Sequence, residues 1–97
     1  MLIRVRLFGE LREYMMGTPV TMEIPEGSSV RDFIFEMAMI RRPFAQRLMT
    51  NNELRPEFKI MVNGRDIDFL SKMETRLKDR DMVSILPVAG GGQRANS

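Results

Sequence analysis

The segment with the clearest capacity for chemistry is the glycine-rich stretch Leu86-Pro87-Val88-Ala89-Gly90-Gly91-Gly92 near the C-terminus. Pro87 lacks an amide N–H, so the apolar strand expected before it should stop there. Glycine has no Cβ, so Gly90 to Gly92 form a thin thread that can enter a narrow tunnel in another protein. One interpretation is a tail built for insertion, with a terminal carboxylate as its reactive group. The alternative is an ordinary frayed, glycine-rich terminus.

The residue types that are missing narrow the chemistry further. The 97 residues include no cysteine and no histidine. The sequence therefore offers no disulfide, no thiol nucleophile and no thiolate metal site, and it lacks the usual acid–base group near neutral pH. Any reaction must use carboxylates, lysines, Tyr14, hydroxyls or the chain terminus, and no metal site or bound cofactor is expected.

Composition and charge are typical of one small globular domain. Residues are 43% hydrophobic and 29% charged, and the chain has room for one core. No apolar run approaches the roughly 18 residues of a membrane span, and the first residues lack a signal-peptide core. We therefore expect a cytoplasmic protein without a membrane partner. The 15 basic and 13 acidic residues interleave along the chain, which argues against nucleic-acid binding.

Alternating apolar residues predict two strands in the first quarter of the chain, at residues 2–8 and 18–24. Gly9 should end the first strand, and Pro19 marks the second as an edge strand. Together they form an antiparallel hairpin with a long loop, in which residues 10–14 make one helical turn. The inward side chains are those of Ile3, Val5, Leu7, Val20, Met22 and Ile24.

A helix follows the turn at residues 25–28, with Ser29 as its N-cap and Asp32 in its first turn. Its apolar residues recur at helical spacing, so one face should pack on the sheet. Those residues are Val30, Phe33, Ile34, Met37 and Ile40. Phe35 and Met39 fall on the opposite side and receive no role. Pro43 should end the helix by Arg41 or Arg42.

The second half of the chain predicts a second short helix, more strands and one tight hairpin. The helix covers residues 43–49, a turn follows at 50–52, and the nearby arginines (Arg41, Arg42, Arg47 and Arg55) form a solvated face. A strand at 58–62 turns back at Asn63-Gly64 into a short strand within 65–69. A polar connection anchored by Leu77 leads to the final strand, 82–86. Inward positions are Ile60, Val62, Val83 and Ile85.

This order of elements is typical of an α+β protein with the β-grasp (ubiquitin-like) fold: a mixed sheet of four to five strands with one main helix on one face. The first and last strands should pair in parallel at the centre of the sheet. The domain then spans residues 1–88, and residues 89–97 form a flexible tail that leaves past one end of the sheet.

The outer sheet face is expected to be a partner-binding surface. It carries Phe8, Met61, Met82 and Leu86, although the exposed face of a one-sided sheet should be polar. Pro87, Val88 and Ala89 extend this surface into the tail. Arg4, Arg6 and Lys59 share the face, where they meet an acidic rim on the partner or simply solvate the surface.

Several motifs in this order resemble the ubiquitin-like sulfur carriers, and the closest type is the small subunit of molybdopterin synthase. They are Phe8-Gly9-Glu10-Leu11-Arg12-Glu13, Pro25-Glu26-Gly27-Ser28-Ser29-Val30, and residues 62–70, 73–79 and 81–91. The resemblance implies that an adenylating enzyme of the ubiquitin-activating type uses ATP to activate the terminal glycine. A thiocarboxylate then forms and delivers sulfur to a pterin precursor in the large synthase subunit. The chain would be a carrier subunit of such a sulfurtransferase complex, without catalysis of its own.

Spacing from Pro87 assigns the reactive diglycine to Gly90 and Gly91, yet the chain continues from Gly92 to Ser97. A processing protease must therefore release the carboxylate of Gly91. The family's Asp-Gly-Asp turn is here Asp79-Arg80-Asp81, so that turn must accommodate a side chain. The family's double proline is here Leu86-Pro87.

Two other functions remain open on the sequence alone. The chain could be a ubiquitin-like modifier whose Gly91 is joined to lysines of other proteins, or a non-covalent adaptor whose tail is never activated. The acceptor of sulfur could belong to the molybdopterin pathway or to another pathway.

Overall fold

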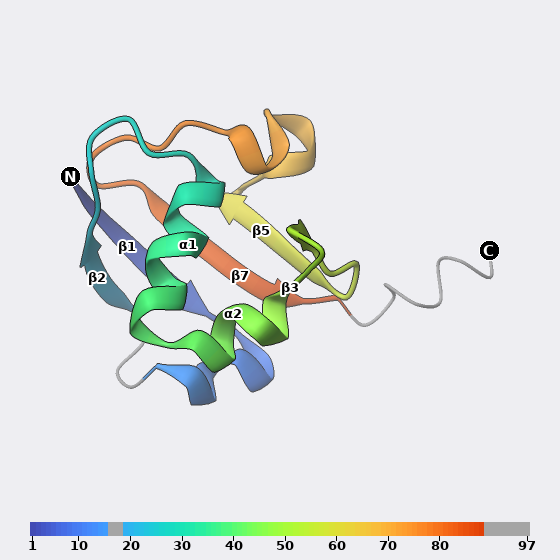
Figure 1. Ribbon diagram of the computed structural model, residues 1–97. Helices are drawn as coiled ribbons and strands as arrows, with labels where there is room; N and C mark the ends of the chain where they lie inside the picture. Colours follow the sequence, from blue (N-terminus) through green and yellow to red (C-terminus); the bar gives the residue numbers. More distant parts are fainter. Residues whose placement is uncertain (16–18, 89–97) are drawn as a thin grey trace.

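A mixed five-stranded sheet, covered on one face by a helix, forms the body of the protein in the computed structural model, which describes residues 1–15 and 19–88 (Figure 1). The strand order is β2-β1-β7-β5-β6. The strands are β1 (Leu2–Leu7), β2 (Val20–Glu23), β5 (Phe58–Val62), β6 (Arg65–Asp66) and β7 (Met82–Pro87). Helix α1 (Val30–Ile40) crosses this sheet, and helix α2 (Arg42–Leu48) packs against α1.

Shorter elements complete the fold. The 3-10 helix η1 (Gly9–Tyr14) follows β1, and the two-residue strands β3 (Met49–Thr50) and β4 (Glu53–Leu54) form a separate hairpin. The 3-10 helices η2 (Ile67–Phe69) and η3 (Lys72–Glu74) lie between β6 and β7. None of the helices in the described part of the chain is long and apolar enough to cross a bilayer.

The first and last strands pair in parallel at the centre of the sheet, as the sequence predicts. Val5 lies opposite Val83 and Leu7 lies opposite Ile85. Strand β5 pairs antiparallel with the other edge of β7, and β2 pairs antiparallel with β1. A helix that crosses a mixed sheet with parallel first and last strands is the β-grasp, ubiquitin-like arrangement.

The core lies between the inner sheet face and α1. Side chains alternate strictly between buried and exposed along β1, and the predicted inward residues of β5 and β7 are buried. On α1 the stripe of Val30, Phe33, Ile34 and Met37 is buried, which confirms the predicted helix face. The assignment of Ile40 to this face is wrong, because its side chain is 59% exposed. The chain turns into α2 directly after Ile40, and α2 fills this end of the core with its own apolar residues.

Local sequence signals set the boundaries of α1. The Ser29 side chain accepts a hydrogen bond from the Asp32 N–H, and the Asp32 carboxylate accepts one from the Ser29 N–H, which completes a capping box. These hydrogen bonds to Ser29 lower the pKa of Asp32. The helix ends at Ile40, and α2 begins two residues later with Pro43 in its first turn, where a missing N–H costs nothing.

Two tight turns redirect the second half of the chain. Asn63 and Gly64 have φ angles of 52° and 83°, which is the geometry of the predicted β-hairpin. The returning strand is shorter than the predicted segment 65–69. The Asp66 carboxylate accepts a hydrogen bond from the Asp68 N–H and turns the chain into η2. Asn51 and Asn52, with φ angles of 52° and 66°, turn β3 back onto β4.

The turn before β7 accommodates Arg80 at a φ of 72°, a conformation that favours glycine. Backbone hydrogen bonds hold it there, since the Arg80 N–H donates to the carbonyl of Leu2 at 2.6 Å. The Leu2 N–H in turn donates to Asp79 Oδ1 at 2.7 Å. The expectation that this turn must accept a side chain is confirmed, and the turn ties the start of β1 to the start of β7.

Candidate functional site

Strand β7 carries the chain to the glycine-rich segment from the middle of the sheet. Pro87, the last residue of the strand, lies opposite Phe58 of β5. One residue later the Val88 N–H donates to the carbonyl of Glu57 at 2.8 Å. The last described residue is therefore still fastened to the β5 side of the sheet, and the base of the tail has a defined position.

Pro87 is tolerated in this central strand because the neighbouring strand has already ended. The Phe8 N–H donates to the carbonyl of Ile85 at 3.0 Å, which is the last parallel contact between the two segments. Continuing the ladder would require an N–H at Pro87, which proline lacks. The Phe8 carbonyl instead accepts from the Leu11 N–H at 3.2 Å and opens η1. The chain therefore passes from β1 into η1 at the point where Pro87 of β7 has no N–H to offer the Phe8 carbonyl.

Gly9 and Pro87 pack against each other at this point. Gly9 has a φ of 61°, and a Cβ at this position would lie 2.8 Å from Pro87 Cγ. Only glycine fits both the backbone conformation and this contact. The sequence alone indicates Gly9 only as the residue that ends a strand. Its contact with Pro87, at the other end of the chain, gives Gly9 a second role, because it helps to hold the residue from which the tail leaves the sheet. We call this arrangement of Gly9, Pro87 and Val88 the seat of the tail.

Arg47 braces the same region from α2. Its guanidinium pairs with Glu10 of η1 at 2.9 Å and lies 3.7 Å from Glu57, whose carbonyl holds Val88. It also lies over the Phe58 ring, 4.7 Å from the ring centroid. The hydrogen bond with Glu10 raises the pKa of Arg47. The sequence predicts a solvated face for Arg47, whereas the structure shows it linking α2 to η1 and to the segment of Glu57 and Phe58.

The predicted docking residues share the outer sheet face, but they do not form one cluster. Leu7 lies opposite Ile85, so the next residue, Phe8, lies beside Leu86 at the tail end of the sheet. Met61 lies opposite Ser84 in mid-sheet, and Met82 lies opposite Arg4 at the far end. Phe8 is 40% exposed, whereas Met61, Met82 and Leu86 are half-buried. The apolar part nearest the tail is therefore formed by Phe8 and Leu86.

Positive charge accompanies these residues on the outer face. Arg4 and Arg6 are exposed, and within residues 1–15 and 19–88 neither has an ion pair. Lys59 differs, because its ammonium contacts Asp66 Oδ2 at 2.6 Å. Burial raises the pKa of Asp66, but hydrogen bonds from Lys59 and the Asp68 N–H outweigh it and lower that pKa overall. The charge of Lys59 is thus largely neutralised, and the arginines dominate the face.

The described residues contain ion pairs but no group of acidic side chains arranged to hold a metal ion. The predicted reactive residues Gly90 and Gly91, together with Ala89, lie outside the described part of the chain. What the described arrangement can do is hold a C-terminal strand and its first following residue in a fixed position.

Comparisons with known proteins cover both the fold and the glycine-rich segment. The model of the ThiS family matches residues 5–92. The chain is 28% identical to small archaeal modifier protein 3 of Haloferax volcanii over 90 residues, which are 93% of this chain and 98% of that protein. Over 45 residues it is 40% identical to an Archaeoglobus fulgidus protein named "Putative sulfur carrier protein", covering 46% of this chain and 51% of the other.

A solved structure from Pyrococcus furiosus, named "Putative molybdopterin converting factor, subunit 1", superposes with a TM-score of 0.73 at 27% identity. The superposition covers 91% of this chain and 98% of the other. Such a score over nearly the whole of both chains means that the strand order and the helix crossing described above are shared.

Proposed function

Because the chain belongs to the ThiS family of ubiquitin-like sulfur carriers and modifiers, we propose that it carries sulfur as a thiocarboxylate on Gly91. The observation that carries the proposal is the seat of the tail. A central strand ends at Pro87, the Val88 N–H still donates to the Glu57 carbonyl, and Gly90 and Gly91 follow after Ala89. A firm base with a slender end suits a reactive terminus that must enter the active site of another protein.

The proposed chemistry requires no catalytic side chain from this protein. A carboxylate is a poor acyl donor, because its leaving group would be an oxide ion. When an oxygen of the Gly91 carboxylate attacks the α-phosphorus of ATP, pyrophosphate leaves and an acyl-adenylate forms. A sulfide nucleophile then attacks the acyl carbon and displaces AMP, which leaves the thiocarboxylate. Both steps belong to an adenylating enzyme of the ubiquitin-activating type, so ATP is that enzyme's substrate.

Activation also requires the residues after Gly91 to be removed. While Gly91 is joined to Gly92 by a peptide bond it has no carboxylate, so ATP cannot activate Gly91 in that form. A protease that cuts after Gly91 would produce the reactive form.

The outer sheet face is the proposed docking surface for both partner enzymes. Phe8, Leu86, Pro87 and Val88 surround the base of the tail, and Met61 and Met82 continue the face toward its far end. Methionine adapts to more than one partner surface. Arg4 and Arg6, which have no ion pair among the described residues, favour partners with an acidic rim.

The proposed acceptor is a pterin precursor in the large subunit of a molybdopterin synthase, in the cytoplasm. This assignment rests on the motifs between Val62 and Gly91 and on the name of the Pyrococcus furiosus relative. The second candidate is a protein modifier whose Gly91 is joined to lysines, and it is favoured by the match to a small archaeal modifier protein over 93% of the chain. Tail fragments attached to lysines of other proteins through isopeptide bonds, found in a tryptic digest, would support the modifier.

The proposal is tested with three purified forms: the chain ending at Gly91, the chain retaining residues 92–97, and Gly91→Ala in the shortened form. Each is incubated with ATP and the adenylating enzyme of the same organism, and intact masses are measured. We expect an adenylate on the Gly91 form alone, because only it presents a slim, free glycine carboxylate. The same adenylate on the chain that retains residues 92–97 would contradict the assignment of Gly91.

A further inference from the structure

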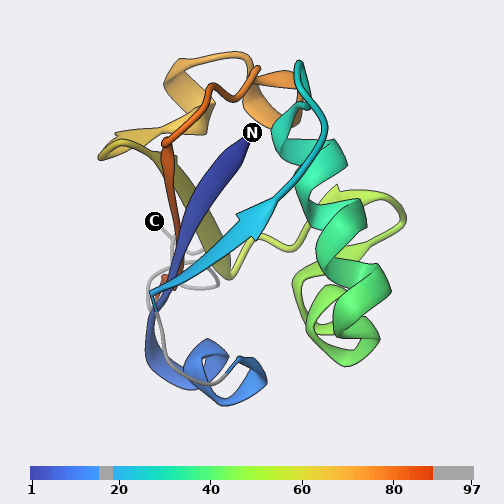
Figure 2. The ribbon, with the colours of Figure 1, turned by 90° about the vertical axis from the view of Figure 1, so that its left-hand side faces the viewer.

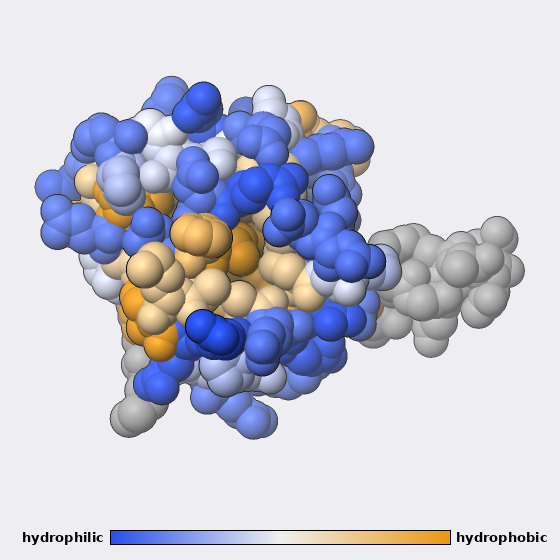
Figure 3. Space-filling view, viewed as in Figure 1, coloured by the Kyte–Doolittle hydropathy of each residue, from blue (hydrophilic) through white to orange (hydrophobic). Residues whose placement is uncertain are grey.

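The solvent side of α1 carries large apolar side chains that the core does not use. Phe35 is 68% exposed and Met39 is 75% exposed, and they stand one helical turn apart. Figure 3 shows apolar residues gathered over α1 and α2 within a polar surround. An exposed apolar patch with a polar rim is typical of an interaction site. This patch lies on the helix side of the molecule, away from the outer sheet face.

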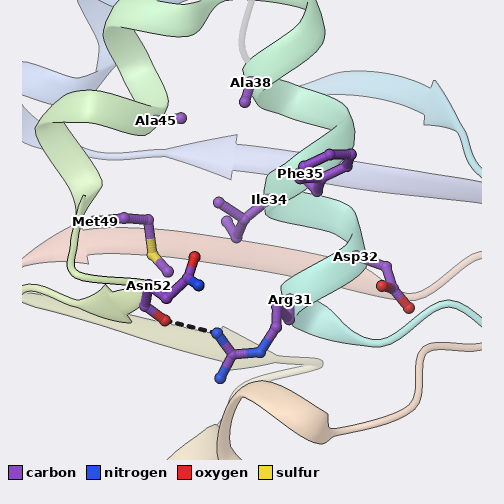
Figure 4. Close-up of a pocket in the computed structure, with 8 residues that line it drawn as sticks. All are labelled: Arg31, Asp32, Ile34, Phe35, Ala38, Ala45, Met49 and Asn52. Carbon is purple, nitrogen blue, oxygen red and sulfur yellow. Dashed lines mark hydrogen bonds between the residues drawn. The ribbon is translucent and has the colours of Figure 1, made fainter.

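A groove opens beside Phe35, between α1 and α2. Its hollow has a volume of about 520 Å³, and its apolar lining comes from Ile34, Phe35 and Ala38 of α1, Ala45 of α2, and Met49. Figure 4 shows the Arg31 guanidinium closing one end through a hydrogen bond to the Asn52 carbonyl, 2.6 Å long. The hollow is larger than a phenylalanine side chain. The molecule therefore presents an aromatic knob next to an apolar hole.

Charge varies along the same stripe of α1. Glu36 lies next to Phe35, and Arg42 stands where α1 gives way to α2, beyond Met39. At the N-terminal end of the stripe, Arg31 is paired with Glu74 and the Asp32 carboxylate accepts a hydrogen bond from the Ser29 N–H. Glu36 and Arg42 make no ion pair within the described part of the chain. The charges that the stripe leaves for a partner are therefore Glu36 beside Phe35 and Arg42 beyond Met39.

We propose that this stripe packs antiparallel against the same stripe of a second copy of the chain. Reversing the direction places Arg42 of each copy toward Glu36 of the other, and it sets Phe35 of each copy over the other's groove. Both contacts then occur twice about a two-fold axis, as in an isologous dimer. An unrelated partner would not require knob, hole and both charges on one surface.

The dimer leaves the proposed carrier function unobstructed. Helices α1 and α2 lie on one side of the sheet (Figure 2). The register and the alternation of the strands place Phe8 and Leu86 on the opposite, outer face. Both copies thus keep a free docking face and a free tail base. Dimer formation does not depend on the proposed carrier function, because the association of the protein with itself is measured without any adenylating enzyme.

The first test measures association by sedimentation velocity from about 1 μM to about 1 mM, a range that covers weak dimers. The wild type should change from monomer to dimer within it. Phe35→Asp should weaken association by about tenfold or more, since a charge would replace the knob. Phe69→Asp is the matched control, because Phe69 is 84% exposed in η2, and it should dimerise like the wild type. A wild type that stays monomeric throughout, or equal effects of the two variants, would overturn the proposal.

The second test uses charge reversal and identifies the second copy as the partner. Glu36→Arg and Arg42→Glu should each weaken self-association, because each puts like charges together. Mixing the two variants should restore the dimer as a heterodimer, in which opposite charges meet again on both sides. Circular dichroism confirms that each variant is folded. A mixture no more associated than its components would show that these charges do not meet across a two-fold axis, and would refute the antiparallel arrangement.

Discussion

Gly9 packs against Pro87 at the base of the tail, and the substitution Gly9→Ala measures how much this packing contributes to the free energy of unfolding. Alanine at a φ of 61° costs about 1–2 kcal/mol for the left-handed conformation. Its Cβ would also lie 2.8 Å from Pro87 Cγ and 3.3 Å from Pro87 Cδ. Relieving such overpacking costs about 1–3 kcal/mol. The substitution should therefore lower the free energy of unfolding by about 2–5 kcal/mol.

Gly64→Ala separates the two contributions. Gly64 also has a positive φ, 83°, but a Cβ at this position would meet nothing within 4 Å, so only the conformational cost of about 1–2 kcal/mol applies. Urea denaturation of both variants gives the comparison. Pro87→Ala removes the ring atoms that Gly9→Ala would strike. In that background Gly9→Ala should cost no more than Gly64→Ala, which gives a double-mutant coupling of about 1–3 kcal/mol.

One pair of measurements would refute this reasoning. If Gly9→Ala costs the same as Gly64→Ala and the cost is unchanged in the Pro87→Ala background, the proline ring moves aside freely. The base of the tail would then not be held by this contact, and the inference of a firm seat would fail.

Three further predictions concern the rest of the fold. Phe33→Ala should cost about 3–5 kcal/mol in denaturant melts, because Phe33 is fully buried, whereas the exposed Phe35→Ala should cost less than about 1 kcal/mol; a loss under about 1 kcal/mol for Phe33 would mean that the helix face is assigned wrongly. Arg80→Gly should raise the free energy of unfolding by about 1 kcal/mol, because it removes a side chain from a φ of 72°, and a loss of stability would contradict this reasoning. The pKa of Asp66 is below its ordinary 3.8, so its stabilising contribution is present above that value and is lost as pH falls through the folded pKa. Asp66→Asn should therefore flatten the fall in stability measured as the pH is lowered below about 4, and an unchanged fall would assign it to other carboxylates.

Most of the sheet and the main helix could be predicted because their residues follow strict periods. Alternation along 2–8 and 82–86 identifies the inward faces, and Ser29 with Asp32 identifies the start of α1. The wrong assignment of Ile40 arises because α1 ends there and α2 takes over the packing of the core. The other differences arise where an element is too short to show a period. The hairpin of β3 and β4 rests on two residues per strand and an Asn-Asn turn, and β6 stops early because Asp66 makes a local turn.

The candidate site is predictable as a segment but not as a structure. Its glycines and the direction of the last strand follow from sequence order. The packing of Gly9 against Pro87 joins residues from opposite ends of the chain, and no local pattern reveals it. In the sequence Arg47 resembles any surface arginine, and only the packing of α2 places it between Glu10 and Glu57. The helical period correctly places Phe35 on the outer side of α1, but the groove beside it depends on where α2 packs.

The most direct test of the central claim is the intact mass of this protein purified from its own cells under conditions that preserve thioacids. We expect a chain whose last residue is Gly91, with a fraction heavier by the replacement of one carboxylate oxygen by sulfur. Fragmentation should place that sulfur on Gly91. A chain that retains the residues after Gly91 and carries no sulfur, in cells where sulfur transfer is active, would contradict the account.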